Sequence, residues 1–205
     1  WLALPVAIIT FFARGYVVNF IKNGGNILIA GILGAMVVMI LFRIIYHILA
    51  RAFFAQQDTK TPMYISIFAI GLNIGLAIFL SMTLGMKAYG LAWAQSIVAV
   101  VEVAILFVVL STKMPGIFTR GFWRAVTRMT IAGAGMGMIT YLTVLIFPLQ
   151  SGDQSFFSTF PKFTLISLIS FAAYLGLSKI LKVREANPVI DKINKILFAK
   201  VGPTS

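Results

Sequence analysis

The sequence has few of the side chains on which soluble enzymes depend. It contains no cysteine, one histidine and five acidic residues among 205. The missing cysteine excludes a disulfide framework, a thiolate metal site and a cysteine nucleophile. The single histidine and the few carboxylates leave little material for acid–base catalysis or for a metal site. Charged residues make up 11% of the chain, against roughly a quarter in a typical soluble domain.

Long apolar runs take the place of the missing charges. Hydrophobic residues form 60% of the chain, and an apolar run of about 18 or more residues is typical of a membrane-spanning helix. The sequence therefore predicts an all-α, polytopic membrane protein. The net charge of +12 fits a positive-inside bias and contact with anionic lipids better than a nucleic-acid partner.

Six spans are predicted from the apolar runs and the polar turns between them. They cover residues 1–21 (interrupted at Arg14 and Gly15), 27–55, 62–84, 89–111, 125–147 and 161–181. The tail has an amphipathic pattern over 188–198 that predicts a short helix on the membrane surface. The first residue is Trp1 and no charged leader precedes the first apolar run. We therefore expect the chain to be a piece of a longer protein whose remainder precedes Trp1.

The placement of Lys and Arg predicts the orientation in the membrane. The segments 113–128 and 182–205 carry the most Lys and Arg, and such segments face the cytoplasm. Two spans separate them, so the two assignments agree. Both ends of the chain and the loop around Asp58 are then expected on the cytoplasmic side.

Three basic side chains interrupt the second span. Arg43, His47 and Arg51 are spaced by four residues, which places them on one helix face. An arginine at the centre of a span costs roughly 2.5–3.5 kcal/mol on insertion, and its guanidinium binds phosphate through a fork of donors. We interpret the three as substrate-binding residues. The alternatives are an ion pair between Arg43 and Glu102, a packing role for His47, and an Arg51 side chain that reaches the interface.

Two other polar residues lie inside spans. Glu102 is the one acid within an apolar run, and it either partners a cation or relays protons or sodium ions. Asn73 sits in the middle of the third span, where an amide bonds to a neighbouring helix or helps to hold an ion. The pairs Gly71–Gly75 and Gly133–Gly137 have the spacing of close helix contacts.

The most specific stretch is residues 51–62, Arg-Ala-Phe-Phe-Ala-Gln-Gln-Asp-Thr-Lys-Thr-Pro. It resembles the "RaFYAxxDTxTP" signature of the MurJ (MviN) lipid II flippase family. The signature positions are held by Asp58, Thr59, Thr61 and Pro62. Further agreement comes from Leu4-Pro5, from Asn73 and from Gly90-Leu91-Ala92. Together these elements cover nearly the whole chain.

The resemblance implies a fold and an activity. The six spans would be helices nine to fourteen of a two-lobe transporter of the multidrug/oligosaccharidyl-lipid/polysaccharide exporter type. Residues 1–112 would be the last four helices of the second lobe, 113–182 an extra helix pair forming a lipid-tail groove, and 183–205 a cytoplasmic amphipathic tail. The implied activity is movement of the undecaprenyl-diphosphate-linked peptidoglycan precursor across the bacterial cytoplasmic membrane by alternating access. A monomer without a cofactor, coupled to sodium, protons or the membrane potential, is implied.

Other functions stay open from the residues alone. An exporter of the same fold would carry another polyprenyl-linked saccharide, such as an O-antigen or teichoic-acid precursor, or act as a multidrug exporter. A membrane enzyme acting on polyprenyl phosphates would need clustered acids or histidines, and Asp58 has no such companion in the sequence. A non-transporting scaffold would leave the charges inside the spans dispensable.

Overall fold

The computed structural model describes residues 1–21, 26–149, 156–186, 188–189 and 192. In chain order the elements are α1 (Ala3–Phe12), α2 (Arg14–Ile21), α3 (Ile27–Ala55), α4 (Lys60–Ile78), the π-helix η1 (Phe79–Thr83), α5 (Ala88–Lys113), α6 (Arg120–Ile146), α7 (Phe156–Ile180) and the 3-10 helix η2 (Arg184–Ala186). Five of these helices are long and apolar enough to cross a membrane, and the bent pair α1–α2 makes a sixth if it is counted as one span. The predicted all-α, multi-pass class is confirmed. The surface helix expected over 188–198 lies largely outside the described residues.

Side-chain caps set two of the helix starts. Asn26 precedes α3, and its Oδ1 accepts from the backbone N–H of Leu28 at 2.9 Å, so the helix begins where the sequence predicts. Thr119 caps α6 in the same way, with its Oγ1 accepting from the N–H of Phe122 at 3.4 Å. Because of this cap α6 begins at Arg120, five residues before the predicted span. The basic residues at its start form helical turns rather than a loop.

The first span is broken, as its polar interruption predicts. The axes of α1 and α2 meet at 74°, and the buried Ala13 forms the turn between them. The Arg14 guanidinium carbon lies 5.0 Å from the Phe11 ring centroid. Its Nη1 would be 2.8 Å from a Cβ placed on Gly34 of α3. A glycine at this position therefore lets α3 pack against the arginine at the bend.

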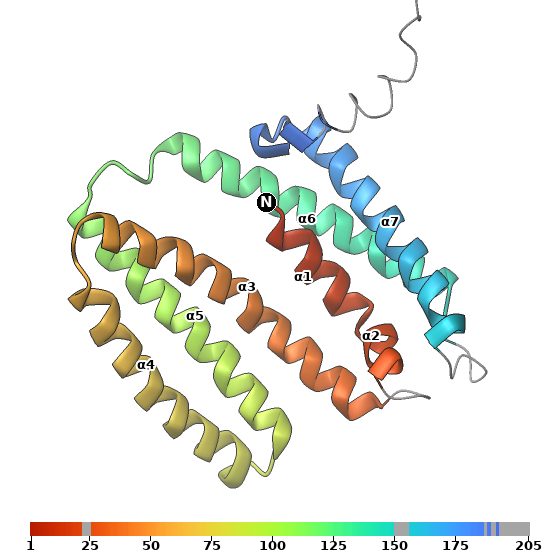
Figure 1. Cartoon of the computed structure of the whole chain (residues 1–205), viewed down its shortest axis with the longest axis horizontal. Coiled ribbons are helices and arrows are strands. Elements are labelled where there is room, and N and C mark those ends of the chain that lie inside the picture. The colour runs from red at the N-terminus through yellow and green to blue at the C-terminus, as the bar shows by residue number, and fades with distance from the viewer. Residues whose placement is uncertain (22–25, 150–155, 187, 190–191, 193–205) are drawn as a thin grey trace, which may run out of the picture.

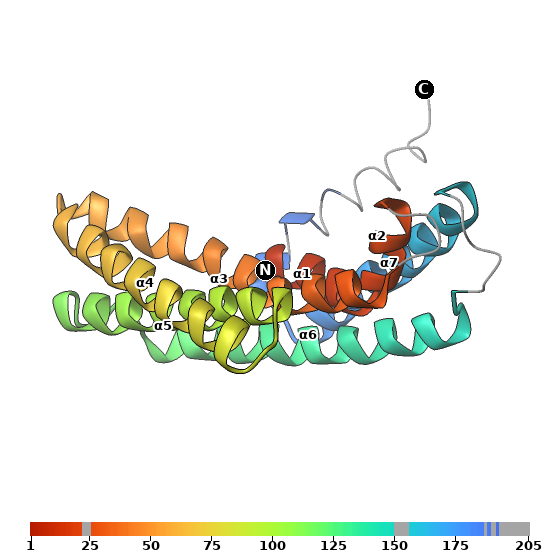
Figure 2. The ribbon, with the colours of Figure 1, turned by 90° about the horizontal axis from the view of Figure 1, so that it is seen from below.

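The helices pack side by side in the order α4, α5, α3, α1, α6 and α7 (Figure 1). Seen edge-on they form an elongated slab rather than a sphere (Figure 2). Helix α1 joins the α3–α4–α5 group to the α6–α7 pair. Because lipid tails are as apolar as these side chains, close packing rather than the hydrophobic effect holds such helices together.

Three clusters of buried side chains hold the slab together. They consist of Leu49, Phe53, Ile65, Val103, Leu106 and Leu110 between α3, α4 and α5; Ala13, Tyr16 and Ile166 around the bend; and Ala132, Met136 and Tyr174 between α6 and α7. The first is the largest and surrounds α5, the central helix of its group. It gives α5 a fixed position between α3 and α4.

Polar contacts tie the first span to the C-terminal helix pair. Trp1 donates from Nε1 to the Ser178 hydroxyl at 3.3 Å, and the Tyr174 hydroxyl donates to the Trp1 carbonyl at 3.1 Å. At the other end of the span, the buried Asn19 amide donates to Thr159 Oγ1 at 2.8 Å. Hydrogen bonds of this kind replace water where helices meet in a bilayer, so α1, α2 and α7 form one unit.

Of the two predicted glycine contacts, one is confirmed and the other is not formed among the described residues. Gly137 faces α1, where an added Cβ would lie 3.3 Å from the Phe12 ring, and Gly133 faces Leu4. A Cβ added at Gly71 or at Gly75 would meet no atom of another helix within 4 Å among the described residues. They lie on the open face of α4, so their spacing produces no helix contact within the described part of the chain.

Gly90 permits the closest backbone approach between α4 and α5. An added Cβ would lie 2.7 Å from the carbonyl carbon of Leu80 and 2.7 Å from the backbone nitrogen of Ser81. Both atoms belong to the π-helical turn η1, whose wider coil brings its backbone against the start of α5. Backbone atoms cannot swing aside as a side chain can, so this position excludes a larger residue.

We expect Gly90→Ala to destabilise the protein by about 2 kcal/mol, the usual cost of overpacking a tight contact. The measurement is the apparent unfolding temperature in detergent. Gly71→Ala is the matched control, since its Cβ meets no atom within 4 Å and alanine favours a helix over glycine by about 1 kcal/mol. Equal unfolding temperatures for the two variants would contradict the contact at Gly90.

Candidate functional site

A polar network crosses α3, α4 and α5 in the middle of their spans. Arg43 Nη1 donates to Glu102 Oε2 at 3.3 Å, and Ser66 Oγ donates to Glu102 Oε1 at 2.9 Å. The Tyr46 hydroxyl lies 2.9 Å from Ser66 Oγ. Because serine has one proton and gives it to Glu102, Tyr46 is the donor to Ser66. The carboxylate therefore has a cation on one oxygen and a supported hydroxyl on the other.

The two ends of the ion pair differ sharply in exposure. The Glu102 side chain is 4% exposed, whereas that of Arg43 is 53% exposed. Its guanidinium carbon also lies 5.7 Å from the Tyr46 ring centroid, a distance typical of a cation–π contact. Glu102 is thus fixed inside the bundle, and Arg43 reaches it from an open surface.

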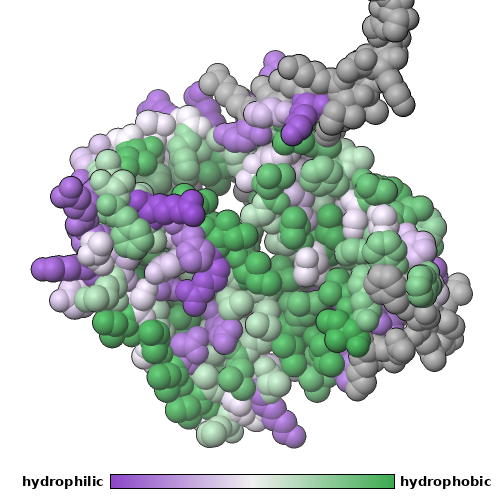
Figure 3. All heavy atoms as spheres, in the orientation of Figure 1, coloured by the Kyte–Doolittle hydropathy of each residue, from purple (hydrophilic) through white to green (hydrophobic). Residues whose placement is uncertain are grey.

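The ion pair forms one wall of a cavity of about 240 Å³ that is bounded by α3, α4 and α5. Its lining consists of Arg43, Ser66, Ala69, Ile70, Asn73, Ile74, Val98 and Glu102. Figure 3 shows hydrophilic side chains gathered over the α3–α4 side of this face, with further hydrophilic groups at its upper and lower edges. Arg43 therefore forms the ion pair with Glu102 that was one alternative, and it also lines a cavity; substrate binding stays a prediction. The sequence also placed Asn73 among the ion-site candidates, and the structure brings it to the same cavity.

The rest of the basic stripe lies outside the cavity. His47 and Arg51 are exposed on α3, one and two turns beyond Arg43. The His47 ring contacts the Tyr46 ring edge-on, with centroids 5.5 Å apart. The predicted common face is confirmed, but the structure does not bring these two residues to Glu102.

Sequence reasoning missed Ser66 and Tyr46. A signal for Ser66 was present, because it precedes Asn73 by seven residues and therefore lies two helical turns away on the same face of α4. Tyr46 follows Arg43 by three residues, which also places the two side chains together. Neither spacing shows which neighbouring helix completes the network.

The signature stretch builds the connection between α3 and α4. Asp58 Oδ1 accepts from the backbone N–H of Thr61 at 3.0 Å, and its Oδ2 accepts from the Thr61 hydroxyl at 2.6 Å. This satisfies an N–H that has no partner within the first turn of α4. Pro62 follows in that turn, where a missing N–H costs nothing. Thr59 immediately precedes the helix.

Lys113, at the end of α5, completes this connection. Its Nζ forms an ion pair with Asp58 and donates to Thr61 Oγ1 at 3.0 Å. The ammonium of Lys113, together with the hydroxyl and N–H of Thr61, holds the pKa of Asp58 well below its usual range. With a lowered pKa, the contribution of Asp58 to stability is complete above the ordinary carboxyl value of 3.8. It is lost only as the pH falls below that value.

An apolar groove of about 660 Å³ lies between α1 and α6. It is lined by Leu4, Ile8, Phe12, Thr130, Gly133, Ala134, Gly137, Met138 and Tyr141. The glycines at 133 and 137 form its floor by keeping α6 free of side chains where α1 crosses. Met138 is 69% exposed at its rim. The groove has the chemistry of a hydrocarbon-binding surface, with α1 as one wall and α6 as the other.

Comparison with known proteins places these features in a family. The family model described as "Lipid II flippase MurJ" matches residues 2–162. A "Probable lipid II flippase MurJ" of Thermotoga maritima is 26% identical over 148 residues, which cover 72% of this chain and 27% of that protein. Proteins with the same description from Rhizobium meliloti and Rhizobium tropici are 33% identical over 108 residues and 24% identical over 181 residues. These matches cover 48% and 85% of this chain, and 18% and 34% of the two proteins. The chain thus spans about a third or less of the curated relatives it matches.

Asp58→Asn should expose the α3–α4 connection to protease. The neutral amide loses the ion pair with Lys113, so the turn opens more often and trypsin cleaves after Lys60 several-fold faster. Cleavage is measured by mass spectrometry at neutral and mildly acidic pH, where Asp58 keeps its charge. Lys113→Arg retains a cation at the contact and is expected to be protected nearly as well as the original chain. A wild-type cleavage rate for Asp58→Asn would show that the ion pair does not hold the turn.

Proposed function

The chain belongs to the lipid II flippase MurJ family, and we propose that it forms the C-terminal helices of a transporter that moves the lipid-linked peptidoglycan precursor across the bacterial cytoplasmic membrane. The family match over residues 2–162 supports this proposal most strongly. A polar cavity among three spanning helices, with the Arg43 side chain on its wall, supports it from the geometry. In the proposal the chain is part of a monomeric, two-lobe transporter that works by alternating access, and its reaction is movement of a lipid rather than catalysis.

Arg43 is the residue proposed to engage the diphosphate of the precursor. A guanidinium presents a fork of donors to two phosphate oxygens and keeps its charge at every relevant pH. The side chain is 53% exposed, so a ligand can reach it from the cavity. His47 and Arg51 continue the same helix face and would extend the basic path toward the membrane surface.

In this proposal, binding of the diphosphate requires Arg43 to exchange its anionic partner, from the Glu102 carboxylate to the phosphate. Without substrate, Arg43 neutralises the buried carboxylate. When a diphosphate arrives, the two anions compete for one guanidinium. A buried carboxylate that loses its cation is costly to leave charged. Substrate binding at Arg43 is therefore proposed to leave Glu102 as a buried carboxylate without its cation, which is unfavourable in free energy.

Coupling to an ion follows from the same geometry. Once Arg43 has turned to the phosphate, Glu102 keeps the Ser66 hydroxyl at 2.9 Å and needs a replacement cation. A proton or a sodium ion can supply it, and Asn73 lines the same cavity. Glu102 and Asn73 are the proposed coupling residues, driven by sodium, protons or the membrane potential, with no cofactor.

The apolar groove between α1 and α6 is the proposed site for the isoprenoid tail. It lies beside the extra helix pair to which the family resemblance assigns tail binding, and α6 belongs to both. The proposed orientation puts the basic start of α6 and the C-terminus at the cytoplasmic face.

Arg43→Ala in the full-length protein should abolish growth when it replaces the flippase of a depleted strain, with membrane insertion intact. Removing the guanidinium takes away the phosphate contact, and Arg43→Lys should restore activity only in part, because it keeps the charge without the fork. The readouts are complementation and protein level in the membrane fraction. Ile44→Ala, an exposed neighbour on α3, is the matched control. Full complementation by Arg43→Ala at normal expression would contradict the proposed role of Arg43 in binding the diphosphate.

Ala134→Phe should block the groove, because the exposed alanine lies on its lining and a phenyl ring would fill the space. The expected result is at least a several-fold loss of crosslinking between the protein and a photoreactive polyprenyl phosphate. Ile131→Phe adds a similar ring on an exposed part of α6 outside the groove and should leave crosslinking unchanged. Equal crosslinking of the two variants would argue against tail binding between α1 and α6.

A further inference from the structure

A second charged cavity lies at the other end of the slab, between the start of α6 and the end of α7. It measures about 440 Å³. Its lining consists of Gly121, Phe122, Arg124, Ala125, Arg128, Lys182, Val183 and Glu185. The Arg43 network, the groove between α1 and α6 and the signature stretch use none of these residues, so the cavity needs its own explanation.

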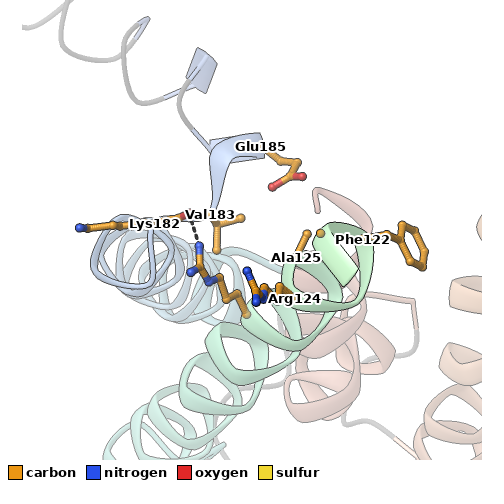
Figure 4. A pocket seen from close by; sticks show the side chains of 8 residues that line it. Phe122, Arg124, Ala125, Lys182, Val183 and Glu185 are labelled. Atoms are coloured by element: carbon orange, nitrogen blue, oxygen red, sulfur yellow. Dashed lines mark hydrogen bonds between the residues drawn. The ribbon is translucent and has the colours of Figure 1, made fainter. Parts of the chain in front are cut away.

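Two arginines on one helix face give the cavity its character. Arg124 and Arg128 are four residues apart in α6, which places both side chains on the same side of the helix. Arg128 Nη1 donates to the Lys182 carbonyl at 3.3 Å, which directs its guanidinium to the end of α7. Figure 4 shows the Lys182 side chain pointing away, so its carbonyl rather than its ammonium faces α6. The two guanidinium groups then outnumber the single carboxylate of Glu185.

The cavity lies at the depth of lipid head groups. Helix α6 has 27 residues, whereas about 20 suffice to cross the hydrocarbon layer. Its first two turns, which carry Arg124, therefore extend into the interface, and Arg128 lies one turn deeper, within reach of the interface through its long side chain. Trp123 is 52% exposed in these turns, and tryptophan favours this level of the membrane.

We propose that this cavity binds the phosphate of an anionic phospholipid head group. Arginine pairs suit phosphate because their planar forks match its oxygens, and basic pockets between spanning helices are typical sites for such head groups. The lipid would join the start of α6 to the end of α7 through one phosphate. The proposal requires only that α6 and α7 cross the membrane, so it stands or falls separately from lipid II transport.

The test is native mass spectrometry of the purified full-length protein titrated with phosphatidylglycerol, with phosphatidylcholine as the neutral lipid. Each arginine is expected to contribute about fivefold, so Arg124→Gln/Arg128→Gln should weaken phosphatidylglycerol binding about 25-fold. Arg120→Gln/Lys179→Gln removes two charges from the same membrane face but outside the cavity. This matched control should change binding less than twofold.

Glu185→Gln supplies a change of opposite sign, which a general loss of structure cannot imitate. It removes the carboxylate that opposes an anion, so binding of phosphatidylglycerol should strengthen about fivefold. Arg124→Gln alone provides a variant that leaves the bond between Arg128 and Lys182 intact. It should still lose about fivefold and keep its unfolding temperature.

Four results would overturn the proposal. Equal weakening by the cavity pair and the control pair would mean that phosphatidylglycerol responds only to surface charge. Unchanged binding in the cavity pair would mean that the lipid binds elsewhere. Displacement of phosphatidylglycerol by inorganic phosphate at equal concentration would assign the cavity to a soluble anion. Much tighter binding of undecaprenyl diphosphate, lost in the same variant, would assign it to the transported lipid.

Discussion

A buried carboxylate in a membrane-spanning helix constrains the whole α3–α4–α5 group. Glu102 is 4% exposed, so its charge is tolerable there only beside a cation and a donor. Arg43 comes from α3 and Ser66 from α4, and each contacts one carboxylate oxygen. This fixes the rotation of both helices about α5. The cavity beside this network is lined by residues of all three helices.

The other half of the molecule is organised by small residues and neutral hydrogen bonds. Gly133 and Gly137 let α1 cross α6 closely, and Thr140 of α6 bonds to Ser170 of α7 at 2.9 Å. Trp1 and Asn19 bond to α7 at the two ends of the bent span. Arg14 contributes one charge at the bend, and the arginines of α6 lie in its first three turns. The two halves therefore differ in chemistry, with a charged site within the bilayer in one and a charged site at its surface in the other.

The sequence predicts local features of this structure well and partnerships between helices poorly. Apolar runs predict every span, because length and hydropathy alone decide what crosses a bilayer. The spacing of Arg43, His47 and Arg51 predicts their common face, since it depends only on the helix repeat. The start of α6 was missed because its basic residues look like a loop until the Thr119 cap is seen.

Contacts between helices depend on how each helix is rotated about its axis, which a single sequence does not encode locally. The pairing of Arg43 with Glu102 could be named as one alternative, because few charges were available inside the spans. The roles of Ser66, Tyr46 and Lys113 could not, since hydroxyls and surface lysines have many possible partners. The same limit explains why, among the described residues, Gly133 and Gly137 contact another helix and Gly71 and Gly75, with identical spacing, do not.

The proposed exchange of Glu102 for a diphosphate at the Arg43 guanidinium can be tested directly by solid-state NMR. The measurement is the dipolar coupling between ¹⁵N in the Arg43 guanidinium and ¹³C in the Glu102 carboxylate, in liposomes with and without undecaprenyl diphosphate. A strong coupling between Arg43 and Glu102 is expected without ligand. When the diphosphate binds, this coupling should weaken and a ¹⁵N–³¹P coupling should appear. A coupling between Arg43 and Glu102 that stays unchanged in the ligand-saturated protein would contradict the proposed exchange.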